Sequence, residues 1–485
     1  MLVTPEILTS CSKDWEERER AAEAMVPLVG ALYRDRSVET SIFGRLIVKR
    51  TVHDILVAHE FVQQVEKVTV SPFDTLEVLQ ALTALPLGPS HIDIGKLFVN
   101  YQNSDSGQSL PEFLNDTLAD AFVEGAAEAA EIKDVVLYGF GRIGRLLARL
   151  LCDRSGGGKG IRLRAIVVRK GKGNDLAKRA SLLMKDSVHG AFKGVVNIDE
   201  ENTSLVVNGQ QIQVIYSDSP DAIDYTAYGI DNAVVVDNTG KWRDEEGLSL
   251  HLQAKGAAQV LLTAPAKGSI KNVVHGINNN IISDDDKILS AASCTTNAIT
   301  PVLKAMHEKF GVINGHVETV HAYTNDQNLI DNYHKGDRRG RSAPLNMVLT
   351  ETGAAKAVAK ALPEMEGKLT GSSVRVPTPN VSLAILNLNL EEAVDKETIN
   401  DYMRYIALHS ELQKQVDYSN SPEAVSSDFV GSRAAGIFDA LATIANGNHC
   451  VLYVWYDNEF GYACQVVRIL RQITHATLPV YPVEQ

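Results

Sequence analysis

Apolar residues recur at the spacing of one helical face through the first part of the chain. Residues 22–33 carry this pattern, residues 76–82 repeat it, and a proline-glycine breaker closes it at 86–89. Ser109 and Glu112 form a capping box, which predicts a helix running to about residue 131. We find no chemical motif in this region. Residues 1–130 are therefore predicted to form a helical N-terminal extension that serves docking or oligomerisation.

The pattern then changes to short apolar runs that alternate with helical stretches. Strands are predicted at 135–138, 163–168, 233–236 and 259–263, with helices such as 143–153 and 246–255 between them. Such alternation is typical of the α/β class, here a Rossmann-type doubly wound parallel sheet covered on both faces. Mixed strands and helices after residue 293 predict an α+β catalytic domain. We expect the sheet domain at 131–293, joined by 458–485, and the catalytic domain at 294–457.

Composition limits the partners and the location. The chain of 485 residues is 45% hydrophobic and 22% charged, as ordinary soluble proteins are, and its net charge is −13. This acidity argues against nucleic acid or an anionic membrane as a partner. No apolar run reaches the roughly 18 residues of a membrane span. The five cysteines lack the spacing of a metal or redox site, so we expect no metal and a reducing, cytoplasmic location.

A glycine-rich motif joins the first predicted strand to its helix: Gly139-Phe140-Gly141-Arg142-Ile143-Gly144. In this context one glycine permits a tight turn, another a close backbone approach to a pyrophosphate, and another close packing of helix on strand. The helix N-terminus supplies free N–H groups to the same phosphates. The motif predicts a dinucleotide cofactor.

The second predicted strand ends in Arg169 and Lys170, where a carboxylate normally accepts hydrogen bonds from the adenosine ribose. Two cations at this point attract a 2′-phosphate, which favours NADP over NAD. The alternative is that both side chains extend into solvent and contact no cofactor.

Cys294, between Ser293 and Thr295, stands at the start of another predicted helix. A thiol at a helix N-terminus has its thiolate stabilised by the free N–H groups and the helix dipole. His321 ends a later apolar strand, and an imidazole there can pair with the thiol and accept a proton. We predict that Cys294 is a nucleophile and His321 its base.

Several longer motifs occur in one order and closely resemble phosphorylating glyceraldehyde-3-phosphate dehydrogenase. The resemblance covers about residues 131–480 and leaves residues 1–130 unmatched. It rests on YGFGRIGR at 138–145, ASCTTN at 292–297, TVHAYTND at 319–326, TGAAK at 352–356, LTG at 369–371, RVPTPNVS at 375–382 and WYDNE at 455–459.

The resemblance implies roles for the remaining site residues. Ser293, Thr295, Thr352 and Gly353 match the site of the attacking inorganic phosphate, although Thr295 and Thr352 can also be ordinary helix caps. Thr324 and Arg375 match the residues that hold the phosphate of the phosphorylated aldehyde substrate, with Asp326 as their neighbour.

Other matches concern the cofactor and the assembly. Asn458 matches the asparagine that orients the nicotinamide amide, with Tyr462 beside it. Thr239 and Thr263 follow the third and fourth strands and match loops beside the adenine and ribose. The charged segment 332–341 matches a loop that reaches a neighbouring subunit, so the resemblance implies a homotetramer.

Three positions depart from the family pattern. Ala298 replaces a second cysteine, Phe460 replaces a tryptophan, and Asn332-Tyr333 replaces the Leu-Pro of the NAD-specific loop, a second indication of NADP. The predicted reaction is the oxidation of glyceraldehyde 3-phosphate to 1,3-bisphosphoglycerate. Two alternatives stay open: an erythrose-4-phosphate dehydrogenase, and a regulatory or scaffold protein that kept the fold without the chemistry.

Overall fold

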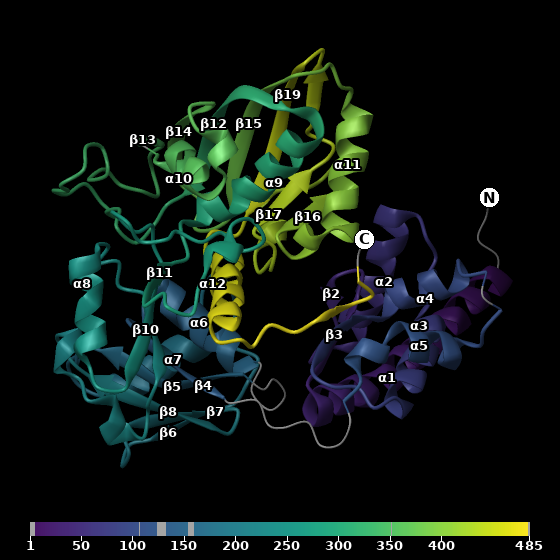
Figure 1. The fold of residues 1–485 in the computed structure, drawn as a ribbon, viewed down its shortest axis with the longest axis horizontal. Coiled ribbons are helices and arrows are strands. Elements are labelled where there is room, and N and C mark those ends of the chain that lie inside the picture. The colour runs from purple at the N-terminus through teal and green to yellow at the C-terminus, as the bar shows by residue number, and fades with distance from the viewer. Residues whose placement is uncertain (1–4, 106, 124–131, 154–159, 351, 484–485) are drawn as a thin grey trace. The chain divides into compact units, whose positions relative to one another are not determined.

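The computed structural model describes residues 5–105, 107–123, 132–153, 160–350 and 352–483, with backbone only for residues 5–8. The chain divides into two compact units. The first contains residues up to 131 together with 477–485, and the second contains most of residues 132–476 (Figure 1). Within the described ranges, no helix combines the length and the apolar character needed to cross a bilayer.

The first unit is less helical than the sequence indicated. Besides its helices it contains a four-stranded sheet with the strand order β2-β1-β3-β20. The elements are α1 (Pro5–Arg36), β1 (Val38–Ile42), β2 (Arg45–Leu46), α2 (Val52–Glu66), α3 (Pro72–Ala84), β3 (Ser90–Asp93), α4 (Ile94–Gln102), α5 (Leu110–Thr117), the 3-10 helix Ala119–Ala121 and β20 (Val480–Tyr481).

The last strand of this sheet comes from the other end of the chain. Strand β20 pairs in parallel with β3, and the amide of His91 donates to the carbonyl of Pro479 at 2.8 Å. The Tyr481 ring joins the apolar core of the first unit. Residues 477–485 therefore belong to this unit, which corrects our assignment of 458–485 as a whole to the Rossmann domain.

The capping box that was predicted before the last helix of this unit is present. The amide of Ser109 donates to the Glu112 carboxylate at 2.9 Å. The helix it starts, α5, ends at Thr117, much earlier than the predicted end near residue 131. Residues 124–131 lie outside the described ranges.

The Rossmann part of the second unit confirms the predicted α/β class. Its sheet has the strand order β11-β10-β9-β4-β5-β8-β7-β6, and strands β11 to β8 in that order are parallel. The strands are β4 (Lys133–Tyr138), β5 (Ile161–Val168), β6 (Val196–Asp199), β7 (Ser204–Val207), β8 (Gln210–Tyr216), β9 (Ala233–Asp237), β10 (Ala257–Leu262) and β11 (Ile288–Ser290). Its helices are α6 (Arg142–Asp153), α7 (Asp175–Met184), α8 (Glu245–Ser249) and α12 (Phe460–Ile473), with 3-10 helices at Pro220–Ala222, Tyr225–Tyr228, Leu250–Gln253 and Asn279–Ile281.

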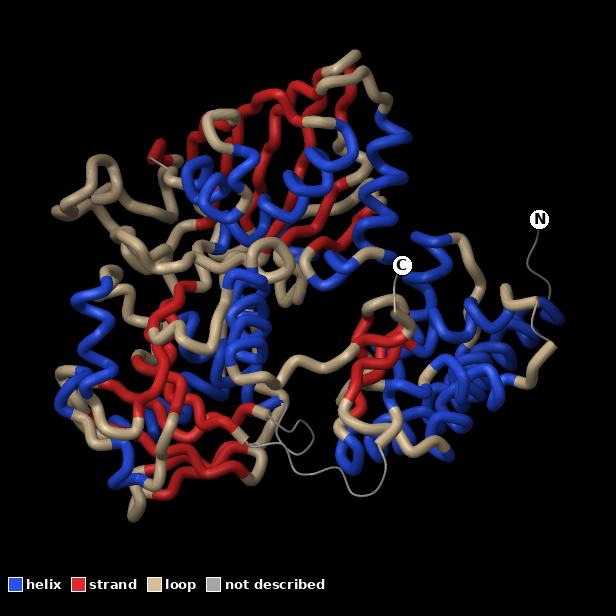
Figure 2. Tube along the Cα trace, viewed as in Figure 1, coloured by secondary structure: helices blue, strands red, loops and turns tan. Residues whose placement is uncertain are grey.

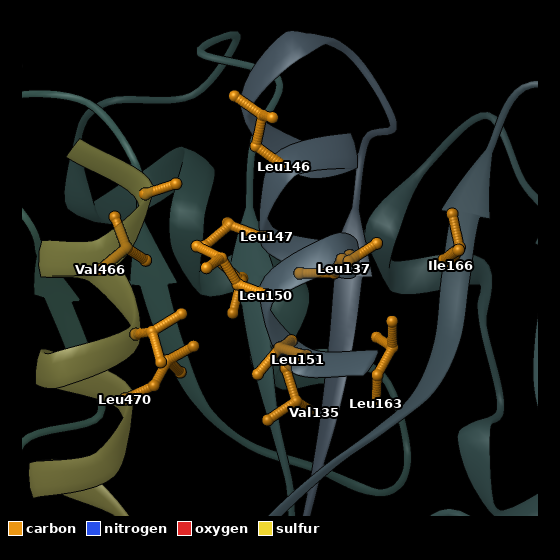
Figure 3. Packing of buried hydrophobic residues seen from close by; sticks show 14 of the residues in the cluster. Val135, Leu137, Leu146, Leu147, Leu150, Leu151, Leu163, Ile166, Val466 and Leu470 are labelled. Carbon is orange, nitrogen blue, oxygen red and sulfur yellow. The ribbon is translucent and has the colours of Figure 1, made fainter. Parts of the chain in front are cut away.

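Alternate residues of β4 face the two sides of this sheet, which is why its apolar run is continuous. Val135 and Leu137 face α6, and α6 packs against α12, as Figure 3 shows for Leu147, Val466 and Leu470. Burying one leucine side chain of this kind contributes about 2 kcal/mol. The terminal helix α12 therefore belongs to the core that positions the glycine-rich turn.

The catalytic part is an α+β layer arrangement, as predicted. Its sheet has the order β13-β14-β12-β15-β19-β17-β16, with β18 paired to β19, and helices lie beside these strands in Figure 2. The strands are β12 (Val312–Ala322), β13 (Val348–Thr350), β14 (Leu369–Val376), β15 (Ser382–Leu390), β16 (Val416–Ser419), β17 (Gly436–Asp439), β18 (Ile444–Asn446) and β19 (His449–Tyr456). The helices are α9 (Cys294–Phe310), α10 (Ala354–Ala361) and α11 (Lys396–His409), with 3-10 helices at Pro363–Met365, Glu411–Lys414 and Ser426–Phe429.

Candidate active site

The glycine-rich turn between β4 and α6 leaves a backbone surface free of side chains. Gly139 has φ +96°, and a Cβ on Gly144 would lie 2.3 Å from the Gly139 carbonyl oxygen, so neither position accepts a side chain without strain. A Cβ on Gly141 would meet no atom within 4 Å. The turn thus combines a tight bend, close packing and an open face at a helix N-terminus, which fits a dinucleotide pyrophosphate.

The other members of the motif contribute to this turn through their backbone. Phe140 is buried in the core, and Ile143 packs against the same core. The Arg142 guanidinium donates to Glu459 through Nε at 2.9 Å and through a second nitrogen, and it also contacts Asp186. The Arg142 side chain is therefore engaged within the protein, and its position in the sequence gave no sign of that.

Three further predicted cofactor residues follow neighbouring parallel strands. Arg169 follows β5 with its side chain exposed, and its carbonyl oxygen accepts from Arg179 at 3.0 Å. Thr239 follows β9, where its amide and hydroxyl both donate to the buried Asp237 at 2.7 Å. Thr263 follows β10, and its hydroxyl donates to the Asp237 carbonyl at 3.0 Å. Because carboxyl ends of parallel strands share one edge, these residues lie along the side of the sheet that carries the glycine-rich turn.

Cys294 is the first residue of α9, which follows strand β11. Ser293 caps the helix, because its hydroxyl accepts from the Thr296 amide at 3.0 Å. The Cys294 Sγ lies 3.6 Å from the His321 Nε2, so the structure brings together the predicted nucleophile and base.

Arg375 approaches the same histidine from the adjacent strand. His321 and Arg375 are register partners on the parallel strands β12 and β14. The Arg375 guanidinium lies 2.6 Å from His321 Nδ1 and donates to the Ala322 carbonyl at 3.0 Å. Strand pairing therefore places a fixed positive charge beside the base and the thiol.

Burial governs the protonation of this pair. Burial, and then the Arg375 charge, lower the pKa of His321 to about 3. Burial also raises the pKa of the Cys294 thiol, although the Arg375 charge and hydrogen bonds from Thr295 act in the opposite direction. The helix N-terminus and the His321 pairing favour the thiolate, whereas burial of the charge acts against it in the folded site.

The residues predicted to bind phosphate are hydrogen-bonded to protein groups in this structure. The Thr352 hydroxyl accepts from the Ala354 amide at 3.1 Å, just before α10, and the N-cap residue Gly353 is exposed. The Thr295 hydroxyl pairs with the buried Tyr456 hydroxyl at 3.0 Å. The Thr324 hydroxyl donates to Asp326, which in turn forms an ion pair with Arg339.

Asn458 and Tyr462 stand at the start of α12 in different roles. The Asn458 side-chain oxygen accepts from the Ser382 hydroxyl at 2.8 Å, and the same hydroxyl accepts from the Ala322 amide. The buried Tyr462 hydroxyl donates to the Ala292 carbonyl at 2.9 Å. Ala292 has φ +54°, so Tyr462 supports the turn that precedes Cys294.

Sequence reasoning missed two residues of this site, Tyr456 and Glu459. The Tyr456 hydroxyl contacts Thr295, and its ring meets the His321 ring edge-on with centroids 6.0 Å apart. Glu459 binds Arg142 and His189. Both belong to the WYDNE segment already quoted for the resemblance, so that segment was the available signal.

The fold and the glycine-rich turn define the class of the protein, an oxidoreductase with a dinucleotide-binding Rossmann domain. Residues 133–245 match the family domain described as "Glyceraldehyde 3-phosphate dehydrogenase, NAD binding domain", and residues 293–458 match "Glyceraldehyde 3-phosphate dehydrogenase, C-terminal domain". The chain belongs to the glyceraldehyde-3-phosphate dehydrogenase family, as the resemblance implied.

Two kinds of relative support this membership. A "Glyceraldehyde-3-phosphate dehydrogenase-like protein" of Pseudomonas aeruginosa is 59% identical over 94% of this chain and 100% of its own length. The plasmid glyceraldehyde-3-phosphate dehydrogenase of Cupriavidus necator is 39% identical and the Geobacillus stearothermophilus enzyme is 40% identical, each over 70% of this chain and nearly their whole length. The alignment with the first relative thus extends well into the N-terminal unit of this chain.

Proposed function

We propose that this protein is a phosphorylating glyceraldehyde-3-phosphate dehydrogenase that prefers NADP. The observation that carries the proposal is the group formed by the buried His321 and the partly buried Cys294 and Arg375, with Sγ 3.6 Å from Nε2. A scaffold protein has no need to keep a nucleophile, a base and a cation in contact.

In the proposed first step, Sγ attacks the aldehyde carbon and the thiol proton passes through His321 Nε2 to the new hydroxyl. The product is a thiohemiacetal on Cys294. His321 then takes that hydroxyl proton while the bound nicotinamide supplies the chemistry of accepting a hydride. The resulting thioester is cleaved by inorganic phosphate, which releases the thiolate and the acyl phosphate, 1,3-bisphosphoglycerate.

The two phosphate groups require neutral donors as well as a charge. Arg375 and the Thr324 hydroxyl are proposed to hold the phosphate of the substrate, for which a guanidinium offers a bidentate contact. The Thr295 hydroxyl, the cap at Ser293 and the exposed backbone at Gly353 are proposed to hold the attacking phosphate. Their present hydrogen bonds, such as Thr295 to Tyr456, keep these donors ordered before either phosphate arrives.

The preference for NADP rests on Arg169. Its side chain is exposed at the carboxyl end of β5, where the adenosine ribose is expected. Lys170, the second cation there, lies over the Tyr216 ring at 5.4 Å. A 2′-phosphate would therefore meet Arg169 first.

We also propose a homotetramer in the cytoplasm, with docking or oligomerisation as the role of the first unit. Exposed large apolar side chains gather between residues 329 and 349 and support self-association, since soluble monomers rarely expose such patches. They are Leu329, Ile330, Tyr333, Leu345, Met347 and Leu349, each at least 60% exposed.

Steady-state kinetics with NAD and NADP, on glyceraldehyde 3-phosphate and erythrose 4-phosphate, test the proposal. We expect turnover to require inorganic phosphate, to be faster on the three-carbon aldehyde and to favour NADP. Arg169→Asp should lower NADP affinity about tenfold, whereas the same charge change at the exposed Lys193 should not. Faster turnover of the four-carbon sugar, or none with either aldehyde, would replace this function by one of the alternatives.

A further inference from the structure

A cluster of charged side chains connects three segments of the Rossmann part, one of which is the helix that follows the glycine-rich turn. Arg142 starts α6, Asp186 and His189 follow α7, and Glu459 directly precedes α12. Arg142 contacts both carboxylates, using two nitrogens for Glu459. The His189 Nε2 lies 3.2 Å from the second Glu459 oxygen. The cluster thus links the helix of the glycine-rich turn to the start of the terminal helix.

The residue between the two carboxylates at the start of α12 is Asn458. On one side, Asp457 accepts from the amides of Glu459 and Phe460 at 3.0 and 2.8 Å, and from the Gly431 amide at 2.8 Å. On the other side, Glu459 is held by Arg142. The backbone of Asn458 is therefore fixed from both neighbours, and its side chain is held by Ser382.

Asp186, Glu459 and Arg142 keep their charges across the neutral range. Burial opposes ionisation of Asp186, but the amides of His189 and Val188 and the Arg142 guanidinium lower its pKa to about 2. Burial likewise opposes ionisation of Glu459, yet hydrogen bonds from Arg142 and His189 keep its pKa below the ordinary value. The hydrogen bonds that Arg142 donates to Glu459 raise the pKa of the guanidinium.

Partly buried ion pairs of this kind are seldom the most stable packing, because each charge loses its hydration. A bidentate guanidinium–carboxylate pair instead fixes distance and orientation, since both planes must align. Here it fixes the distance between two segments that lie 317 residues apart in the sequence. One carries the open turn for the pyrophosphate, and the other carries the proposed partner of the nicotinamide.

We infer that Arg142 and Glu459 are positioning residues that set Asn458 at the correct distance from the glycine-rich turn for the nicotinamide end of the cofactor. The inference rests on the proposed function, together with the nicotinamide-orienting role that the family resemblance implies for Asn458, and deepens it. Neither side chain needs to touch the cofactor, because both act through the segment that carries Asn458.

The test compares ligands with and without the nicotinamide. Binding of NADP and of 2′-phospho-ADP-ribose, which lacks that ring, is measured by calorimetry on wild-type protein and on Glu459→Gln. We expect NADP to bind about tenfold more weakly to the variant, with the affinity for 2′-phospho-ADP-ribose changed less than about twofold. Asn458→Ala should show the same pattern, and adding Glu459→Gln to it should cause little further loss.

Two more variants keep the result interpretable. Arg142→Lys retains the positive charge but cannot donate two parallel hydrogen bonds to Glu459. If Glu459→Gln does not fold, this variant should show the same weaker binding of NADP with 2′-phospho-ADP-ribose binding nearly unchanged. Asp134→Asn breaks a comparable pair, Arg162 to Asp134 at 2.8 Å, at the amino ends of β4 and β5, and should leave both affinities unchanged. Equal losses for both ligands, or no loss for either, would overturn the positioning role. If wild-type protein bound neither NADP nor NAD, the proposed function would fall and the inference with it.

Discussion

The turn at Gly139 and the turn at Ala292 are built alike and used differently. Each joins a parallel strand to the N-terminus of a helix, and each contains a residue with positive φ, +96° at Gly139 and +54° at Ala292. The first leads to an open face at Gly141, where a Cβ would meet no atom within 4 Å. The second leads to Cys294, where side chains of three strands and one helix converge.

The difference shows two ways of using a helix N-terminus. At α6 the backbone N–H groups are the functional groups, so what matters is the absence of side chains. At α9 the corresponding N–H groups stabilise the thiolate of Cys294, but burial, Arg375 and Thr295 determine the pKa of the thiol. Substitutions at the first turn should therefore change binding, and substitutions at the second should change the rate.

The largest effect should follow Cys294→Ser. Without the thiol no thioester forms, so kcat should fall at least about 10⁴-fold, while the dissociation constant for NADP stays within about twofold. Steady-state rates and calorimetry on the same preparation measure both. Cys11→Ser, an exposed cysteine on α1, is the matched control and should keep full activity. If Cys294→Ser retained substantial turnover, the rate-determining role of this turn would be wrong.

The comparison also shows what local sequence can reveal. The glycine-rich motif predicted the turn, and the helix predicted from about residue 296 begins at Cys294, because helix starts depend on neighbouring residues. The strands β4, β5, β9 and β10 were predicted to within two residues at each end, since each contains a short run of consecutive apolar residues. These are the features that a few consecutive residues determine.

What the sequence did not reveal depends on residues far apart in the chain. The parallel pairing of β20 with β3 joins the last residues to the first unit, and no local pattern marks such a partner. The Arg142 side chain was assigned to the cofactor, yet its partner Glu459 lies 317 residues away. A favoured thiolate was predicted from the helix N-terminus and the pairing with His321, but neither pattern reveals burial, which is a property of the folded site.

An intermediate effect should follow Gly141→Val. Its side chain would project into the open face of the turn, so the melting temperature should change little. NADP affinity should fall about a hundredfold, because the pyrophosphate could no longer approach the backbone N–H groups. Gly144→Ala is the contrasting variant, since its Cβ would meet the Gly139 carbonyl oxygen at 2.3 Å and should lower stability as well. Unchanged NADP affinity in Gly141→Val would remove the turn from the cofactor site.

The smallest effect tests the electrostatic side of the comparison. Arg375→Gln removes the cation that opposes burial in setting the pKa of the Cys294 thiol, so that pKa should rise further. A thiol with a raised pKa holds less thiolate at neutral pH, and iodoacetamide should therefore alkylate it several-fold more slowly there. The pH at which alkylation reaches half its maximal rate should move upward. The same substitution should raise the pKa of His321, which Arg375 lowers.

Arg339→Gln is the matched control for this shift. Arg339 lowers the pKa of His321 but is not one of the main causes that shift the pKa of the Cys294 thiol. Arg339→Gln breaks the ion pair with Asp326. It should leave unchanged the pH at which alkylation of Cys294 reaches half its maximal rate. If both variants moved the midpoint equally, the loss of one positive charge anywhere near the site would explain the shift. A specific effect of Arg375 on the pKa of the Cys294 thiol would then be wrong. A midpoint that moved downward in Arg375→Gln would contradict the proposed interaction. If Arg375 stabilises the thiolate, its removal must raise the pKa of the thiol and move the midpoint upward.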